Sequence, residues 1–302
     1  MVGLIFALFF ITFVSSAQLP QHPSIHGKVD LQRLNQLLKH KFDSSHETPE
    51  EIVQTIAHYV PYSGLSYCPD DRVKAMMCGH CKNTKANHIS FVTHSDSGTH
   101  AVILVDKERK EIVVSFRGSE DIFKIFHLIT DDLDHFRINE NGNMLVHKPV
   151  KEYLDYIIND MESKLSLLTK QHHGFDLVLT GHSLGGALAT LAAPILYHKL
   201  HLNPSRLLVV SYGQPKVGNK DFVAYFESLD FPYIRVVNEN DLVPISPVSS
   251  SFSHIRNYVR IDKGTPIQCS KNEPIESRCS TKLLAVIDHS FVGKKIVGAD
   301  GC

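Results

Sequence analysis

The sequence predicts an α/β fold with a mostly parallel central sheet and helices on both faces. Short apolar runs rich in β-branched residues alternate along the chain with segments of helical periodicity. Such strand–helix–strand alternation is typical of a parallel sheet that is covered on both sides. One buried strand also passes directly into a helix through Gly-His-Ser-Leu-Gly-Gly at 181–186. No internal repeat or low-complexity linker is visible, so we expect a single domain over 46–302.

The first helix expected within the domain begins at Thr48-Pro49-Glu50-Glu51. This stretch combines a threonine cap, a proline at the first position and acids in the first turn. This helix should end near Pro61. Three more helices are expected, at VKEYLDYIINDMESKLSLL (150–168), from Leu184 to about Leu200, and at DFVAYFESL (221–229). Six strands are expected from their β-branched content: HISFVTH (88–94), THAVILVD (99–106), EIVVSFRG (111–118), FDLVLTG (175–181), RLLVVSYG (206–213) and FPYIRVVN (231–238).

The first seventeen residues, MVGLIFALFFITFVSSA, form an apolar stretch that ends in small residues. This pattern predicts a cleaved signal peptide over 1–17 and therefore a secreted, extracellular protein. Residues 18–45 are polar except for LQRLNQLL (31–38), whose leucines are spaced for a short amphipathic helix. Two interpretations of 18–45 stay open, a pro-segment and an N-terminal helix packed on the domain.

Composition argues against a nucleic-acid partner and favours disulfides as the role of the cysteines. The formal net charge is −1 and both signs are mixed along the chain, without the basic stripe of a nucleic-acid-binding protein. Six cysteines in an exported chain predict three disulfides, which counting alone could connect in fifteen ways. Cys78 and Cys81 could be half of a zinc site, but the chain has no second pair of similar spacing.

Ser183 lies in Gly-His-Ser-Leu-Gly, which fits the G-x-S-x-G nucleophile elbow. An abrupt strand-to-helix turn strains the serine backbone and crowds the positions two residues away, which explains Gly181 and Gly185. The turn lifts the hydroxyl above the sheet at the amino end of a helix, where free N–H groups stabilise a developing oxyanion. The sequence therefore predicts a nucleophilic serine.

A serine nucleophile needs a base and an orienting acid, which follow the serine in the order acid, then histidine. Asp241 is the best acid because it lies where a strand ends and a loop begins. Asp221 and Asp230 flank an expected helix and resemble solvated surface charges, and Asp262 lies late in the chain.

The base is expected to be His289, which lies after an apolar segment near the carboxyl terminus. Its neighbour Asp288 is a poor orienting acid, since adjacent side chains generally point apart. His254 leads directly into an apparent strand and is interpreted as a structural residue.

These motifs resemble those of the secreted class 3 lipases, best known from filamentous fungi, from about Thr48 onward. The resemblance implies the α/β-hydrolase fold with a short lid helix, the triad Ser183, Asp241 and His289, and oxyanion donors at Ser119 and Leu184. It rests on SFRGS (115–119), TGHSLGGALA (180–189), GQPKVGN (213–219), NENDLVP (238–244) and DHSFVG (288–293).

The cysteine layout repeats that of the fungal enzymes and implies the pairs Cys68–Cys302, Cys78–Cys81 and Cys269–Cys279. The family's lid follows the oxyanion residue. The resemblance therefore implies a short apolar flap here, made by Ile122, Phe123, Ile125, Phe126, Leu128 and Ile129, with Asp131, Asp132 and Asp134 at its polar end. A core helix is the alternative interpretation of these apolar residues. The spacing of these acids makes a poor calcium site. Fungal lids often carry a tryptophan, and this chain has none.

The predicted activity is hydrolysis of lipid carboxylic esters, most specifically triacylglycerol, at a lipid–water interface. Phospholipase A1 or soluble-ester (feruloyl-type) esterase activity on the same scaffold, and an inactive lipid-binding relative, are the alternatives. An apolar lid favours lipid over soluble esters. The resemblance implies no metal or organic cofactor. We expect a monomer that contacts a membrane or lipid-droplet surface only transiently.

Overall fold

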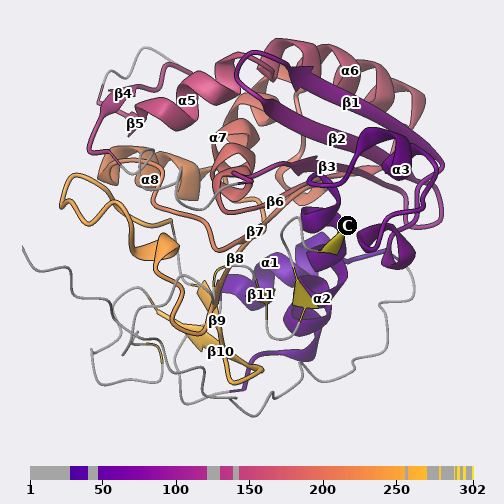
Figure 1. Cartoon of the computed structure of the whole chain (residues 1–302). Coiled ribbons are helices and arrows are strands. Elements are labelled where there is room, and N and C mark those ends of the chain that lie inside the picture. The colour runs from indigo at the N-terminus through magenta and orange to yellow at the C-terminus, as the bar shows by residue number, and fades with distance from the viewer. Residues whose placement is uncertain are drawn as a thin grey trace, which may run out of the picture.

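An eight-stranded sheet forms the centre of the computed structural model (Figure 1). The structure describes residues 28–39, 47–120, 130–138, 143–255, 258–270, 279, 289, 291–292, 295–296 and 301–302. The strands are, in spatial order, β1 (His88–His94), β2 (Thr99–Asp106), β3 (Glu111–Phe116), β6 (Asp176–His182), β7 (Leu207–Tyr212), β8 (Tyr233–Asn238), β9 (Tyr258–Asp262) and β10 (Thr265–Cys269). The five strands from β3 to β9 run parallel, and antiparallel strands extend the sheet at both edges.

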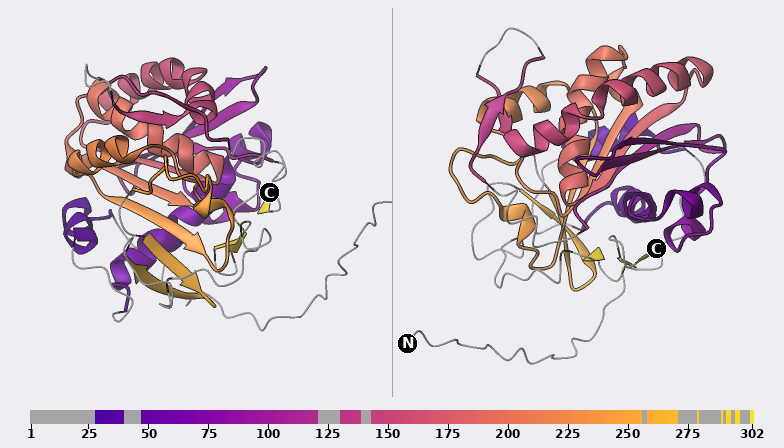
Figure 2. Two further views of the ribbon diagram at one scale, coloured as in Figure 1. Left: turned by 90° about the vertical axis from the view of Figure 1, so that its left-hand side faces the viewer. Right: turned by 45° about the horizontal axis from the view of Figure 1, so that its top comes forward.

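Helices cover both faces of this sheet (Figure 2). One face carries α5 (Lys148–Asp155), α6 (Ile158–Gln171), α7 (Leu184–Lys199) and α8 (Lys220–Ser228), and the other carries α1 (Leu31–Lys39), α2 (Glu50–Leu65) and α3 (Asp70–Lys74). Successive strand residues supply the two cores alternately, as the pleat requires. In β6, Leu177 and Leu179 face the α7 side, and Val178 faces the α2 side.

The remaining elements in the described residues are short. There, three single turns of 3₁₀-helix span η1 (His80–Asn83), η2 (Pro204–Arg206) and η3 (Val243–Ile245). Two small antiparallel ribbons pair β4 (Leu133–His135) with β5 (Leu145–His147) and β11 (Phe291–Val292) with β12 (Lys295–Ile296). No helix in the described part of the chain is both long and apolar enough to cross a bilayer.

The predicted strands and the alternation of elements are confirmed, but the boundaries of α2 are not. The helix continues through Pro61 to Leu65. A proline inside a helix removes one hydrogen bond at a cost of about 3 kcal/mol, and the burial of Tyr59, Tyr62 and Leu65 in the core outweighs it. Thr48 does not cap the helix, because its hydroxyl donates to the Pro266 carbonyl at 3.0 Å.

The long helix predicted at 150–168 is two helices, α5 and α6, separated by a turn at Tyr156 and Ile157. The turn lets each helix direct its own apolar side chains into the core against α7. Val150 and Leu154 do so in α5, and Met161 and Leu165 do so in α6. A hydrophobic pattern that continues across a turn therefore conceals the break.

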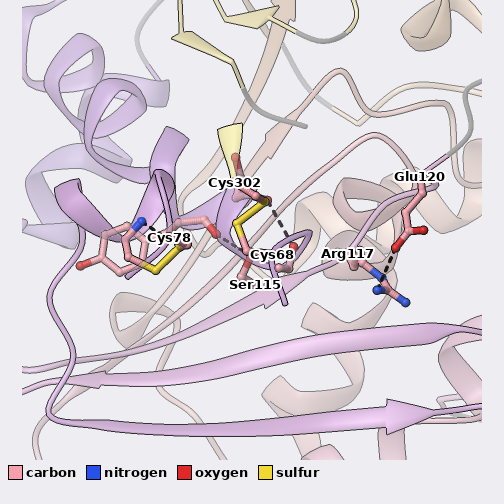
Figure 3. The surroundings of a disulfide bond; sticks show 10 residues. Cys68, Cys78, Ser115, Arg117, Glu120 and Cys302 are labelled. Atoms are coloured by element: carbon pink, nitrogen blue, oxygen red, sulfur yellow. Dashed lines mark hydrogen bonds and ion pairs between the residues drawn. A yellow bond between two sulfur atoms is a disulfide. The ribbon is translucent and has the colours of Figure 1, made fainter. Parts of the chain in front are cut away.

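Three disulfides join Cys68 to Cys302, Cys78 to Cys81 and Cys269 to Cys279, the same pairs that the resemblance implied. Figure 3 shows the first of these, which ties the last residue to the chain just after α2. Backbone contacts reinforce it, since the Gly79 N–H donates to the Cys302 carbonyl at 3.1 Å. Closing a loop of this length stabilises the fold by about 5 kcal/mol in the chain-entropy account.

Candidate active site

Ser183 occupies the sharp turn between β6 and α7, with φ 59° and ψ −127°. L-residues rarely adopt positive φ because the Cβ approaches the backbone, so this backbone is strained. The nearby glycines make the turn sterically possible. A Cβ on Gly181 would lie 2.4 Å from the Gly185 backbone, and one on Gly185 would lie 2.1 Å from the Phe116 carbonyl oxygen. The steric reason inferred for the two glycines therefore holds in the structure.

Asp241 and His289 form a buried pair. Asp241 follows β8 and is 1% exposed, and His289 is 2% exposed. The His289 Nδ1 lies 3.0 and 2.9 Å from the two carboxylate oxygens of Asp241. The Val243 N–H also donates to the Asp241 carboxylate at 2.9 Å. Because a carboxylate only accepts, Nδ1 carries a proton, and in the neutral ring Nε2 then presents a lone pair.

The two atoms that a serine hydrolase must bring together are both buried and unpaired. Within the described residues, neither the Ser183 Oγ nor the His289 Nε2 has a hydrogen-bond partner. The ring of His182, the residue before Ser183, lies 4.5 Å from the His289 ring, centroid to centroid. A buried hydroxyl and a buried basic nitrogen without partners are costly in a folded core, and such exceptions are expected at reactive sites.

The two residues expected to supply the oxyanion donors lie at or near this turn. Leu184 is the first residue of α7, where backbone N–H groups have no partner within the helix. Ser119 follows the end of β3, and this segment packs closely on the turn. A Cβ on Gly118 would lie 2.5 Å from the His182 carbonyl oxygen. Both residues expected to supply oxyanion donors therefore lie near the serine end of β6.

Other residues weighed from the sequence lie elsewhere. His254 bonds the Pro244 carbonyl through Nε2, and Asp230 pairs with Lys39 on the surface. The residues predicted to form a lid, Ile122, Phe123, Ile125, Phe126, Leu128 and Ile129, and also Asp288, lie outside the described residues. In the parts of the chain that the structure describes, no group of three or more His, Cys, Asp or Glu side chains could hold a metal ion.

Sequence reasoning missed Gly213, which has φ +57° and lies against the Asp241–His289 pair. A Cβ there would lie 2.9 Å from an Asp241 carboxylate oxygen and 2.9 Å from two atoms of the His289 ring. The glycine in GQPKVGN was a signal, but only as part of a family motif.

An eight-stranded, mostly parallel sheet with a strained serine after a central strand and a buried Asp–His pair defines an α/β-hydrolase that cleaves carboxylic esters. Residues 113–251 match the family model for lipase (class 3). The lipase of Rhizomucor miehei is 31% identical over 258 residues, which cover 82% of this chain and 70% of that protein. The chain belongs to the class 3 lipase family.

Solved structures agree with this assignment. The Rhizomucor miehei triacylglyceride lipase superposes with a TM-score of 0.77 at 27% identity, over 84% of this chain and 98% of that one. A triacylglycerol lipase whose catalytic centre is formed by a serine protease triad gives a TM-score of 0.74 at 28% identity, over 84% and 98%. By sequence, the lipase of Rhizopus niveus is 27% identical over 247 residues, which cover 78% of this chain and 62% of that protein.

Proposed function

We propose that the protein is a secreted lipase that hydrolyses triacylglycerol at a lipid–water interface. The observation that carries this proposal is the buried Asp241–His289 pair beside the strained Ser183, with the Ser183 hydroxyl and the His289 Nε2 both unpaired. The strain and the missing hydrogen bonds are features of a serine presented to a substrate.

In the proposed reaction, the His289 Nε2 takes the proton of the Ser183 hydroxyl as its oxygen attacks the ester carbonyl. Backbone N–H groups of Ser119 and Leu184 hold the tetrahedral oxyanion. His289 then protonates the departing alcohol and leaves an acyl-enzyme, which a water activated by the same histidine hydrolyses. Asp241 holds the imidazole in the tautomer with Nδ1 protonated and stabilises its charged form.

Four observations support lipid substrates and export. The sequence at 122–129 is largely apolar, and the triacylglyceride lipases reported above share the fold over most of their length. The apolar segment 1–17 resembles a signal peptide, and three disulfides suit an oxidising compartment. Sequencing the amino terminus of protein exported by a eukaryotic host tests cleavage after Ala17.

Ser183→Ala should abolish hydrolysis of emulsified triolein, because it removes the nucleophile. We expect a loss of about 10⁶-fold in kcat, as in other serine hydrolases. The matched control is Ser63→Ala in α2, where a buried hydroxyl donates to the Val60 carbonyl at 2.7 Å. It should lower the free energy of unfolding by about 1 kcal/mol and keep full activity.

The substrate is tested by comparing rates above and below the solubility limit of a triacylglycerol, beside a phospholipid and a soluble p-nitrophenyl ester. A rate that rises when the emulsion forms supports the lipase. Preference for phospholipid indicates phospholipase A1, and cleavage of the soluble ester alone indicates an esterase. Full ester hydrolysis by Ser183→Ala would show that the mechanism is wrong.

A further inference from the structure

His182 lies between Tyr67 and the main chain of His289. The His182 Nε2 is 2.7 Å from the His289 carbonyl oxygen, and its Nδ1 is 3.0 Å from the Tyr67 hydroxyl. His182 and Tyr67 are 5% and 7% exposed. Both ring nitrogens of this buried histidine are therefore hydrogen-bonded, one to a tyrosine 115 residues away and one to the backbone of the expected base.

The direction of these hydrogen bonds follows from the acceptors. A carbonyl oxygen only accepts, so the His182 Nε2 carries a proton and donates it to His289. In a neutral imidazole the other nitrogen is then an acceptor, and the Tyr67 hydroxyl donates to Nδ1. The chain consequently runs one way, from Tyr67 through His182 to the His289 carbonyl.

Burial keeps the members of this chain in these protonation states. Burial, with the neighbouring His289 as a second cause, lowers the pKa of His182 well below its ordinary value. Burial also raises the pKa of Tyr67, so its hydroxyl keeps the proton that it donates. A neutral His182 matters because His289 becomes an imidazolium during the reaction, and a second cation beside it would oppose that step.

The same tyrosine hydroxyl also contacts the segment that carries the expected oxyanion donor. A Cβ on Gly118 would lie 2.1 Å from the Tyr67 hydroxyl oxygen. Gly118 precedes Ser119, and His182 precedes Ser183. One buried hydroxyl is thus packed against the oxyanion segment, bonded to the residue before the nucleophile and connected through it to the base.

We propose that Tyr67 and His182 are positioning residues that fix the main chain of His289, and with it the imidazole, relative to Ser183. The inference rests on the proposed serine hydrolase function. Asp241 holds the His289 ring at Nδ1, and His182 holds the backbone of the same residue. Two anchors on opposite ends of one residue restrict the imidazole more than either alone, and reacting groups must be held within a fraction of an ångström.

The variants are His182→Leu, His182→Gln and Tyr67→Phe, assayed in the full-length enzyme on a soluble p-nitrophenyl ester. Misplacing the base should lower kcat about 100-fold in His182→Leu and about tenfold in Tyr67→Phe, with KM within about twofold. Gln can donate to the His289 carbonyl, so His182→Gln should recover to within about tenfold of wild type.

The matched control is Tyr212→Phe. The Tyr212 side chain is fully buried on the α2 side, and its hydroxyl donates to the Ile56 carbonyl at 2.6 Å. Tyr212→Phe loses a buried tyrosine hydroxyl and its hydrogen bond, as Tyr67→Phe does. We expect a comparable fall in thermal stability in the two variants, but an unchanged kcat in Tyr212→Phe. Equal kcat losses in Tyr212→Phe and Tyr67→Phe would overturn the positioning role, because general loosening would explain both.

Nuclear magnetic resonance of ¹⁵N-histidine protein gives a readout that needs no substrate. His182 should show a protonated Nε2 and an unprotonated Nδ1, and the His289 Nδ1–H signal should broaden in His182→Leu and Tyr67→Phe only. If wild type shows these signals but cleaves no ester, the hydrolase function is wrong, and the hydrogen bonds from Tyr67 through His182 to His289 stand without a catalytic role. An active wild type with unchanged kcat and a sharp His289 signal in both variants would refute the inference.

Discussion

At the scale of single residues, the site depends on where side chains are absent as much as on where they are present. Gly213 has a positive φ and lies against both Asp241 and His289. Gly98, in the turn between β1 and β2, has a similar φ of +68°, but a Cβ there would meet nothing within 4 Å. Comparing Gly213 with Gly98 therefore distinguishes two reasons for a glycine, a positive φ and the need for space beside the reactive groups.

Gly213→Ala should therefore impair both stability and catalysis, and Gly98→Ala only stability. Each alanine costs about 1–2 kcal/mol in a left-handed backbone. Only the alanine at 213 approaches within 2.9 Å of the Asp241–His289 pair, and we expect kcat to fall at least about tenfold there. Urea unfolding and ester hydrolysis measure the two effects. Wild-type kcat in Gly213→Ala would show that the pair tolerates displacement.

At the scale of secondary structure elements, Asn219 connects two of them. Its side-chain oxygen caps α8 by accepting the Phe222 N–H at 2.9 Å and also accepts the Leu145 N–H of β5 at 3.1 Å. The side-chain amide donates to the Asn143 carbonyl at 2.8 Å. One asparagine therefore begins a helix and attaches the β4–β5 ribbon to the domain.

Asn219→Ala should lower the free energy of unfolding by about 2–3 kcal/mol, the sum of a lost cap and two lost hydrogen bonds. Asn203→Ala is the matched control, since its side chain caps only the single turn η2, through Ser205. We expect a loss of about 0.5–1 kcal/mol there. Equal losses in urea unfolding would mean that the contacts to β5 contribute nothing.

At the scale of the whole molecule, four histidines with lowered pKa values make stability depend on pH. Burial is the largest cause that lowers the pKa of His100, His147, His182 and His254. The unfolded chain therefore binds more protons than the folded one once the pH falls below about 6.5, the ordinary histidine pKa. The contribution of these histidines to the free energy of unfolding is fully present above this pH and is lost progressively as the pH falls below it.

We expect the free energy of unfolding to fall between pH 7.5 and 5.5, by up to about 1.4 kcal/mol per pH unit for each histidine below pH 6.5. Urea unfolding at several pH values measures this slope. His254→Gln, which keeps a donor for the Pro244 carbonyl, should make the slope shallower by about a quarter. A free energy that stays constant over this range would contradict the assignment of four neutral histidines.

The sequence by itself determined the features that depend on neighbouring residues. The alternation of apolar strands and helices fixed the fold class, and the glycines around Ser183 revealed the sharp turn. Asp241 and His289 could be selected because the end of a strand and the chain order restrict the acid and the base. These signals are local, since they follow from the periods of strand and helix and from backbone sterics.

Only the tertiary structure decided the contacts between distant segments. It determined that α2 passes through Pro61, that Thr48 bonds β10 and that Gly213 lies under the Asp–His pair. The bond from Tyr67 to His182 depends on how α2 packs beside β3 and β6. Such contacts leave no periodic trace in the sequence, because they arise from the order of strands in the sheet and from the packing of helices on it.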